Sequence, residues 1–586
     1  MFCVEWEGWS KPQVYPDWIV MRLIISVALY LLALTLLLVG IAERTVWAPK
    51  DSKEISVAID SPQPLLVVPH EILKLNPGQP IIKVNGPGRV FVATGRESDI
   101  SAWVGGSAQS LVTYNKGTKK LGSSEIFGLA ASANPNGSDL WRTERAANSE
   151  VLVKVETTNE NALIIASDGL AAAPDKVTIK WHQDYDLTPS NILINSGFVL
   201  LFITLIYNFL VFRNLRNTRR PRRKLPRAPH GPRSRPKRRG SSLPPRGRRS
   251  ARRTFAVIPA SLLVVSMVTG CTPSTQNLAQ TPTTAKTNIA EQPPALQIGQ
   301  IRRIVTAVSR IAKGADQANS ATQLLPRFAG PALEMRDAAY GLLKKTKKAP
   351  ALEPIYASPL TLSLPAATSD WPRILMVATG NKKDTAPQML VLRQDEPRKQ
   401  YQVIYVATLA SGVKLPEVPA VTEGAVPVTP DSAYLTLTPN DLPSAYGSLI
   451  DNGSSSTFFG SFELAGDKFY QTLSVEQKKQ VDTLKKAKLT YQHVMGDAIP
   501  IGLATADGGA LVAVYMKDIT TIKPTKRNSG ITVNELQQVA LGAKGSLKGV
   551  VTTYGDMLLF YVPSVGQDAK VRLLGWQTGL LKVKSL

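Results

Sequence analysis

The sequence predicts a multidomain membrane protein that combines transmembrane helices with an all-β sandwich domain and two tandem α+β cone-like domains. The chain has 586 residues, several times the length of a typical domain. Two uncharged apolar runs are each long enough to cross a bilayer. Short β-branched runs lie between them, and after them helical periodicity is twice followed by strand-like runs.

The two long apolar runs have the length of transmembrane helices. Leu23 to Ala42 contains 20 residues without a charge, and Ile192 to Phe212 contains 21. At about 1.5 Å per residue, either helix would cross a hydrocarbon layer of about 30 Å. We therefore expect spans over residues 21–42 and 192–212.

The formal net charge of +25 is concentrated in one segment. Residues 213–253 hold 18 Lys and Arg and no acid. Because basic residues beside a span stay on the cytoplasmic side, we expect residues 213–254 inside and residues 43–191 outside. A third apolar run after the loop would cross the membrane again, so we expect the C-terminal part outside as well. This loop has no Phe, Tyr or Trp for base stacking. It therefore favours contact with membrane lipids, and no nucleic acid is expected as a partner.

The first twenty residues fit this orientation poorly. They carry three acidic residues against one lysine, whereas a cytoplasmic flank should be basic. Met21-Arg22, followed at once by the apolar run, has the pattern of an ordinary start. Residues 1–20 are therefore interpreted as a non-native or disordered extension.

A third apolar run, residues 255–270, has 16 residues, which is short for a span. Two arginines precede it and Cys271 follows it, so the segment resembles a bacterial lipoprotein signal, which implies that Cys271 is lipidated after cleavage. Residues 271–295 are rich in Thr, Pro, Gln and Ala and are expected to form a disordered tether. The alternative is an uncleaved third span with an incidental cysteine.

Residues 43–191 contain short β-branched runs separated by Gly, Asn, Pro and Asp, which predicts one antiparallel β-sandwich. The segment 95–106 (GRESDISAWVGG) is expected to form a hairpin. An exposed tryptophan among charges would mark a binding surface there, whereas a buried Trp103 would be part of the core, and the second reading is favoured. The residues of this possible binding surface are Arg96, Glu97, Asp99 and Trp103.

After the tether, helical patterns precede strand-like runs, and the same order returns downstream. Helices followed by an antiparallel sheet predict an α+β domain over residues 296–430 and another over residues 431–586. The last expected helix starts at Ser474, where a Ser-x-x-Gln pattern predicts a capping box, and runs to about Lys488. The other expected helices cover residues 296–313, 330–343, 441–451 and 458–464.

This order of elements resembles the nuclear transport factor two or SnoaL-like cone, in which a curved sheet wraps around N-terminal helices. The resemblance rests on element order and implies a fold only. Enzymes of that type use an Asp or His facing the cone interior, and the residues here that correspond are His493 and Asp497.

A second resemblance covers most of the chain from Met21. The sequences GRESDISAWVG and GSDLW in the β-domain, the Arg-rich loop, Cys271 and RFAGPALEMRDAAY (327–340) resemble a group of uncharacterised actinobacterial envelope proteins. This resemblance implies a cell-envelope location and brings no reaction with it.

The residue inventory favours binding or assembly over catalysis. Two cysteines 268 positions apart and four scattered histidines exclude a disulfide framework and a Cys-based zinc site. The sequence has no phosphate loop, nucleophile elbow or HExxH pattern, so no cofactor is expected. We expect a membrane-anchored extracytoplasmic scaffold or binding protein of the bacterial cell envelope, with other envelope proteins or cell-wall polymer as partners. The alternative is an enzyme or small-molecule carrier with a pocket inside a cone.

Overall fold

A computed structural model describes ten segments of the chain, which fall into two compact units. One unit contains the described parts of residues 1–48 and 186–289, and the other contains those of residues 49–185 and 290–586. The predictions for residues 1–16, most of the Arg-rich loop, the third apolar run, Cys271 and the tether lie outside the described residues. The described segments are 17–48, 52–60, 62–128, 133–157, 160–182, 187–218, 292–380, 386–484, 486–526 and 528–586.

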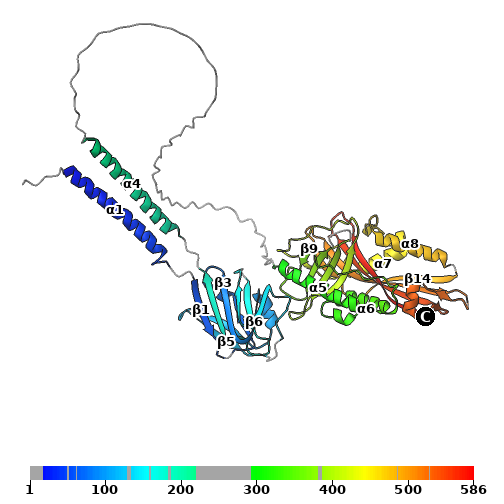
Figure 1. The fold of residues 1–586 in the computed structure, drawn as a ribbon. Coiled ribbons are helices and arrows are strands. Elements are labelled where there is room, and N and C mark those ends of the chain that lie inside the picture. The colour runs from blue at the N-terminus through cyan, green and yellow to red at the C-terminus, as the bar shows by residue number, and fades with distance from the viewer. Residues whose placement is uncertain are drawn as a thin grey trace, which may run out of the picture. The chain divides into compact units, whose positions relative to one another are not determined.

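The first unit is a pair of packed helices, α1 (Asp17–Arg44) and α4 (Thr188–Thr218), which lie side by side in Figure 1. Both are long and apolar enough to cross a membrane, and both predicted helices are confirmed, but α1 begins at Asp17, so residues 17–20 are helical and not part of a disordered extension. The Asn208 side chain donates a hydrogen bond to the Ser26 hydroxyl at 2.7 Å. Gly40 lets the helices approach closely, because a Cβ there would lie 2.8 Å from Cγ1 of Ile194.

The first part of the second unit, residues 52–182, is the β-domain, which forms one eight-stranded sheet. The strands follow the order β1-β8-β3-β7-β2-β4-β5, and β6 pairs with β3. Two helices interrupt the strands, α2 (His70–Leu73) and α3 (Glu97–Val104). The strands are β1 (Ser52–Ala58), β2 (Leu65–Val68), β3 (Pro80–Arg96), β4 (Gln109–Asn115), β5 (Lys120–Ile126), β6 (Thr143–Lys154), β7 (Asn161–Ala166) and β8 (Lys176–His182).

The long strand β3 joins what would otherwise be two sheets. Its residues 80–85 pair with β8, its residues 91–96 pair with β7, and the register against β6 shifts between Asn85 and Arg89. The two ends of the strand order, β1 and β5, contact each other, so the sheet curls around its core. The predicted β-rich domain is found, but the antiparallel two-sheet sandwich is not, because the described strands belong to one curled sheet, in which β2 and β4 pair in parallel.

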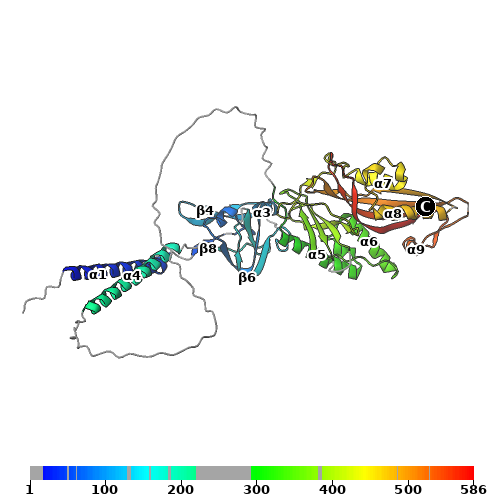
Figure 2. The same ribbon diagram turned by 90° about the horizontal axis from the view of Figure 1, so that it is seen from above.

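The second part of this unit, residues 292–586, is the C-terminal domain. It is built on a ten-stranded sheet with the order β13-β15-β16-β19-β20-β12-β11-β10-β9, with β14 on β16, and β17 pairs separately with β18. Helices α5 (Ile298–Ala318), α6 (Gly330–Lys345), α7 (Leu442–Asn452), α8 (Lys468–Thr483) and α9 (Glu535–Leu541) accompany it (Figure 2). The strands are β9 (Leu360–Pro365), β10 (Arg373–Thr379), β11 (Gln388–Gln394), β12 (Gln402–Leu409), β13 (Pro427–Val428), β14 (Ala487–Met495), β15 (Ile501–Ala504), β16 (Ala510–Pro524), β17 (Ile531–Thr532), β18 (Gly545–Ser546), β19 (Val550–Val562) and β20 (Arg572–Ser585).

The prediction of two separate cone-like domains that meet near residue 430 is wrong. Strand β12 pairs with β20 through Thr408 opposite Trp576, so strands from both predicted halves share one sheet. One hydrophobic cluster also joins the halves, because Leu375 and Leu559 both belong to it. Burying apolar side chains of both halves against each other makes this shared cluster, while a second cluster, from Leu435 to Leu573, belongs to the second half alone.

The expected helices are confirmed at 296–313, 330–343 and 441–451, and two others are corrected. Residues 458–464 form only a short 3₁₀ turn, Phe459–Ser461. Helix α8 begins at Lys468, six residues before the predicted start, because the Asp467 carboxylate accepts a hydrogen bond from the Tyr470 amide. Ser474 therefore lies inside the helix instead of capping it.

Candidate functional site

The residues of the possible binding surface lie where the β-domain meets the C-terminal domain. Residues 97–104 form helix α3 and not the expected hairpin. Arg96, Asp99 and Trp103 are 3%, 2% and 2% exposed, whereas Glu97 is exposed. The burial of Trp103 agrees with the favoured prediction that it is a core residue. The charged residues around it serve a contact inside the described unit.

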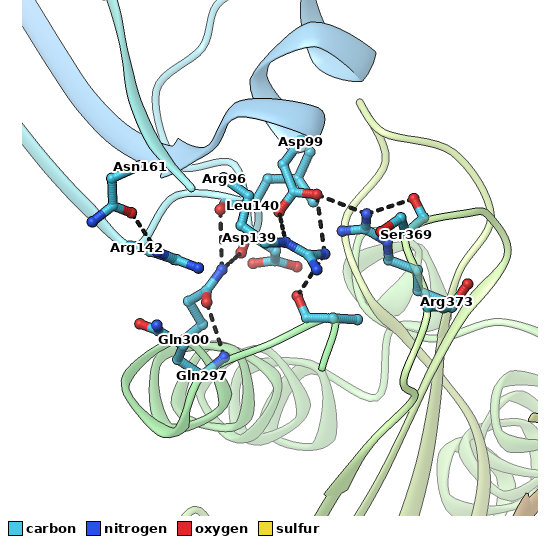
Figure 3. A network of polar contacts seen from close by, with 12 residues as sticks. Arg96, Asp99, Asp139, Leu140, Arg142, Asn161, Gln297, Gln300, Ser369 and Arg373 are labelled. Atoms are coloured by element: carbon cyan, nitrogen blue, oxygen red, sulfur yellow. Dashed lines mark hydrogen bonds and ion pairs between the residues drawn. The ribbon is translucent and has the colours of Figure 1, made fainter. Parts of the chain in front are cut away.

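Asp99 is the acceptor at the centre of this contact (Figure 3). Arg96 donates to both of its carboxylate oxygens, at 3.0 and 3.1 Å. Arg373, at the start of β10 in the C-terminal domain, donates to Asp99 at 2.7 Å and stacks on the ring of Trp371 at 3.8 Å. Arg373 is 0% exposed and Arg96 is 3% exposed, so one carboxylate, that of Asp99, offsets part of the charge of two buried arginines.

A second buried ion pair crosses the same boundary. Arg327 donates to the two carboxylate oxygens of Asp139, at 2.5 and 3.0 Å. The Tyr401 amide donates to the same carboxylate at 2.8 Å. Gln300, in the first turn of α5, donates to the carbonyl oxygens of Asp139 and Leu140 at 3.1 and 3.0 Å (Figure 3). Asp139 and Arg327 lie in two of the motifs noted in the sequence, GSDLW and RFAGPALEMRDAAY, but their pairing was not predicted, because no local pattern shows that residues 188 positions apart will meet.

Two further arginines of the C-terminal domain bind backbone carbonyls of the β-domain. Arg398 donates to the carbonyl oxygens of Trp103 and Val104, at 2.7 and 2.9 Å. These are the last carbonyls of α3, which have no partner within the helix and carry partial negative charge. Arg303 donates to the carbonyl oxygens of Trp141 and Arg142.

The C-terminal domain also contains a cavity of about 520 Å³ between helices α8 and α9 and the face of the sheet. This volume falls within the range of small-molecule sites, about 300–1,000 Å³. Its walls combine aromatic rings, hydroxyls, amides and carboxylates, and no Lys, Arg or His is found among the described residues that line it. The aromatic residues are Phe469, Tyr491, Tyr554 and Trp576, and the acidic residues are Glu476, Asp518 and Asp556.

Two of these carboxyl groups are deeply buried. Asp556, on β19, is 2% exposed, and burial raises its pKa to about 7. Asp518, on β16, is 8% exposed, and burial raises its pKa as well, against the opposing charge of His493. The Oδ1 atom of Asp518 has no hydrogen-bond donor among the described residues. Both carboxyl groups line the cavity, and their ionised forms, which burial disfavours, would gain from a bound cation.

His493 supports the cavity from behind. Its side chain is fully buried, its Nδ1 lies 2.6 Å from an Asp451 carboxylate oxygen, and its Nε2 lies 3.7 Å from Asp518. Burial lowers the pKa of His493, but the hydrogen bond with Asp451 and the charge of Asp518 outweigh it, so the pKa is raised. Asp497, its expected partner, is 90% exposed and pairs with Lys517. The structure therefore does not bring His493 and Asp497 together.

The described residues contain no group of three or more His, Cys, Asp or Glu arranged to hold a metal ion. The cavity combines carboxylates with aromatic faces, an arrangement suited to binding a small molecule that carries positive charge. Local sequence could not reveal this, because Glu476, Asp518 and Asp556 come from α8, β16 and β19 and meet only in the folded sheet.

Comparison with known proteins gives relatives that are lipoproteins. The chain is 28% identical over 225 residues to an uncharacterized lipoprotein of Streptomyces avermitilis, which covers 37% of this chain and 64% of the relative. It is 26% identical over 303 residues to an uncharacterized lipoprotein of Streptomyces coelicolor, covering 49% of this chain and 82% of the relative. The chain thus spans less than two thirds of the length of the Streptomyces avermitilis relative. No solved structure matches it.

These relatives agree with the expected resemblance to lipoproteins of the envelope, whereas SnoaL-like domains are not shown. Together with the two apolar helices, they support a membrane-associated protein. A family model described as a domain of unknown function, DUF8094, matches residues 292–585, which is half of the chain and coincides with the C-terminal domain. The chain therefore belongs to the DUF8094 family.

Proposed function

We propose that this protein is a membrane-anchored extracytoplasmic binding protein whose C-terminal domain holds a small ligand with a positively charged group. The observation that carries the proposal is the cavity of about 520 Å³, lined by three carboxylates and four aromatic rings. The lipoprotein relatives support membrane anchoring, and the 18 basic residues beside α4 support the proposed orientation, in which the folded domains lie on the outer face of the cytoplasmic membrane. This role combines the expected binding protein with the small-molecule carrier that was the alternative.

A cation is the ligand group that the cavity favours. The carboxylates of Asp518 and Asp556 are removed from water, so a donor that pairs with them replaces lost hydration. A charge-assisted hydrogen bond is about twice as strong as a neutral one. Aromatic faces attract cations as well, by about 0.5–2 kcal/mol for each well-placed ring. An anion would gain none of these contacts and would be repelled by the ionised carboxyl groups.

Matched ligands test this proposal on the purified, detergent-solubilised full chain. Tryptamine and indole-3-acetate share an indole ring but carry opposite charges, and cadaverine and glutarate form a second pair without an aromatic ring. We expect the amines to bind and the acids to fail to bind when each is titrated calorimetrically at pH 8. Binding of the acids with equal or greater affinity would contradict the proposal.

Variants place the ligand in the cavity. Asp518→Asn keeps the size of the side chain and removes its charge, so amine affinity should fall by about tenfold or more. Asp497→Asn is the matched control, because Asp497 is exposed and does not line the cavity. Equal losses in the two variants would show that the amine binds elsewhere.

A further inference from the structure

We propose that the β-domain is a docking receptor that holds the C-terminal domain through non-covalent contacts alone, so that the two remain bound when the chain between them is cut. The partner that this surface fits is therefore a DUF8094 domain, supplied here by the same chain. This inference concerns the boundary between residues 52–182 and 292–586 and is independent of the ligand cavity.

Most polar contacts across the boundary run in one direction, and Arg96 of the β-domain, which donates to the Ala295 carbonyl oxygen at 3.5 Å, is an exception. The C-terminal domain supplies four arginines as donors, and the β-domain supplies two aspartates and four backbone carbonyls as acceptors. Docking thus matches a positively charged surface with carboxylates and with the negative end of a helix. The four arginines are Arg303, Arg327, Arg373 and Arg398.

The centre of the boundary is desolvated in the manner of a stable protein interface. Arg327 and Asp139 have side chains only 5% and 7% exposed, and Arg373 and Asp99 only 0% and 2%. Trp371 of the C-terminal domain packs against the cluster that contains Trp103. Buried arginines and tryptophans at the centre of an interface are the residue types that carry most of its binding energy.

Some of these contacts have no role inside the domain that supplies them. Arg303 and Arg398 lie on the C-terminal domain, and the hydrogen bonds found for their guanidinium groups all go to the β-domain, including one from Arg398 to the Ser107 hydroxyl at 2.7 Å. Surface side chains that form hydrogen bonds only with another domain are typical of a docking surface. The family match begins at residue 292, so the docked domain is also the unit that the family defines.

A cleavable version of the full chain tests the proposal. A protease site is inserted within residues 275–290, an affinity tag is placed at the C-terminus, and the protein is cleaved in detergent at physiological salt. The tagged C-terminal fragment is then captured, and the N-terminal fragment that remains with it is quantified. We expect the two fragments to be recovered in equal amounts.

The variant Arg303→Ala/Arg398→Ala removes contacts to the β-domain without leaving a buried charge in its own domain. We expect its fragments to bind at least about tenfold more weakly than the wild type. Lys83→Ala is the matched control, because Lys83 pairs with Glu150 at an exposed site, and it should bind like the wild type. Circular dichroism melting of the uncleaved variants verifies that each is folded.

Three results would overturn the proposal. Wild-type fragments that separate on cleavage while both stay folded would show that the covalent connection is needed. An Arg303→Ala/Arg398→Ala variant that binds like the wild type would show that these contacts do not hold the domains. A Lys83→Ala variant weakened to the same degree would show that the surface lies elsewhere.

Discussion

Three buried titratable groups of the C-terminal domain make its stability depend on pH. Asp556 is buried and its pKa is raised to about 7, so it binds a proton more tightly in the fold than in the unfolded chain. Asp518 shifts in the same direction. His493 also has a raised pKa, so its contribution to stability is present at low pH and is lost as the pH rises through that pKa. All three groups therefore make folding less favourable as the pH rises from the unfolded-state pKa of each group through its raised value, which for Asp556 is about 7.

We predict that the melting temperature of the C-terminal domain falls between pH 6 and pH 8. Asp556→Asn has no proton to lose and should remove a large part of this fall, and it should raise the melting temperature at pH 8. Calorimetric scans at three pH values measure both effects. A melting temperature that rises across this interval, or an Asp556→Asn variant that is less stable at pH 8 than the wild type, would refute the assigned direction.

The buried pair of Asp139 and Arg327 gives a second residue-scale prediction. Asp139→Ala leaves the 4% exposed Arg327 without its carboxylate and the Tyr401 amide without its acceptor. Removing one member of such a pair costs about 3–5 kcal/mol, which urea unfolding would measure. The double variant Asp139→Leu/Arg327→Met should lose less than the single one, because no unpaired charge remains. A single-variant cost below about 1 kcal/mol would contradict the burial of this pair.

At the scale of elements, helix α8 forms one wall of the cavity. Its start depends on Asp467, which accepts hydrogen bonds from the Tyr470 amide at 2.9 Å and from the Tyr446 hydroxyl at 2.7 Å. Tyr446 lies in the hydrophobic cluster beneath the helix and stacks with Phe469. One carboxylate thus sets the end of the helix and anchors it to the core.

Asp467→Ala should lower the free energy of unfolding by about 1–2 kcal/mol for the lost cap, with a further loss because the Tyr446 hydroxyl is left without an acceptor. Asp467→Asn keeps an oxygen acceptor and should lose less. Urea denaturation provides the stabilities, and amine titration of the same proteins should show weaker binding for Asp467→Ala. Equal stability of the alanine variant and the wild type would argue against this cap.

Helix starts and helix periodicity differ in how far sequence alone predicts them. The stripe of apolar residues in α5 is local, so the helix over residues 296–313 is predicted and found. Ser474 and Asp467 both offer a capping side chain, and the tertiary contact of Asp467 with Tyr446 adds to its local cap in favour of the earlier start. In the same way, Asp99 of α3 has the sequence pattern of a surface residue, and its burial follows only from its contacts with Arg96 and Arg373.

At the scale of the whole molecule, pairings between distant strands decide the architecture. The β12 and β20 strands meet although Thr408 and Trp576 are 168 positions apart, and the periodicity of a sequence does not identify so distant a partner. A repeated order of helices and strands therefore suggested two domains where one sheet forms. The apolar helices, the β-rich segment and the strand content could be predicted because each depends on local composition.

A chain truncated after residue 430 tests the single-sheet architecture. It would lose β20 from the edge of β12 and lose Leu559 from the shared core. We expect residues 292–430 of this chain to be rapidly digested by protease and to show no cooperative melting, while the full chain resists digestion. A protease-resistant, cooperatively melting 292–430 segment would favour two independent domains.

The most direct test of the central claim, a cation site in the acidic cavity, is the number of protons released when an amine binds. A bound cation stabilises the ionised form of Asp556, so a group with a pKa of about 7 should release about half a proton per tryptamine at pH 7. Calorimetric titrations in buffers with different ionisation enthalpies measure this number. We predict release of at least that value in the wild type and clearly less in Asp556→Asn. Proton uptake, or an equal release in both proteins, would contradict the account.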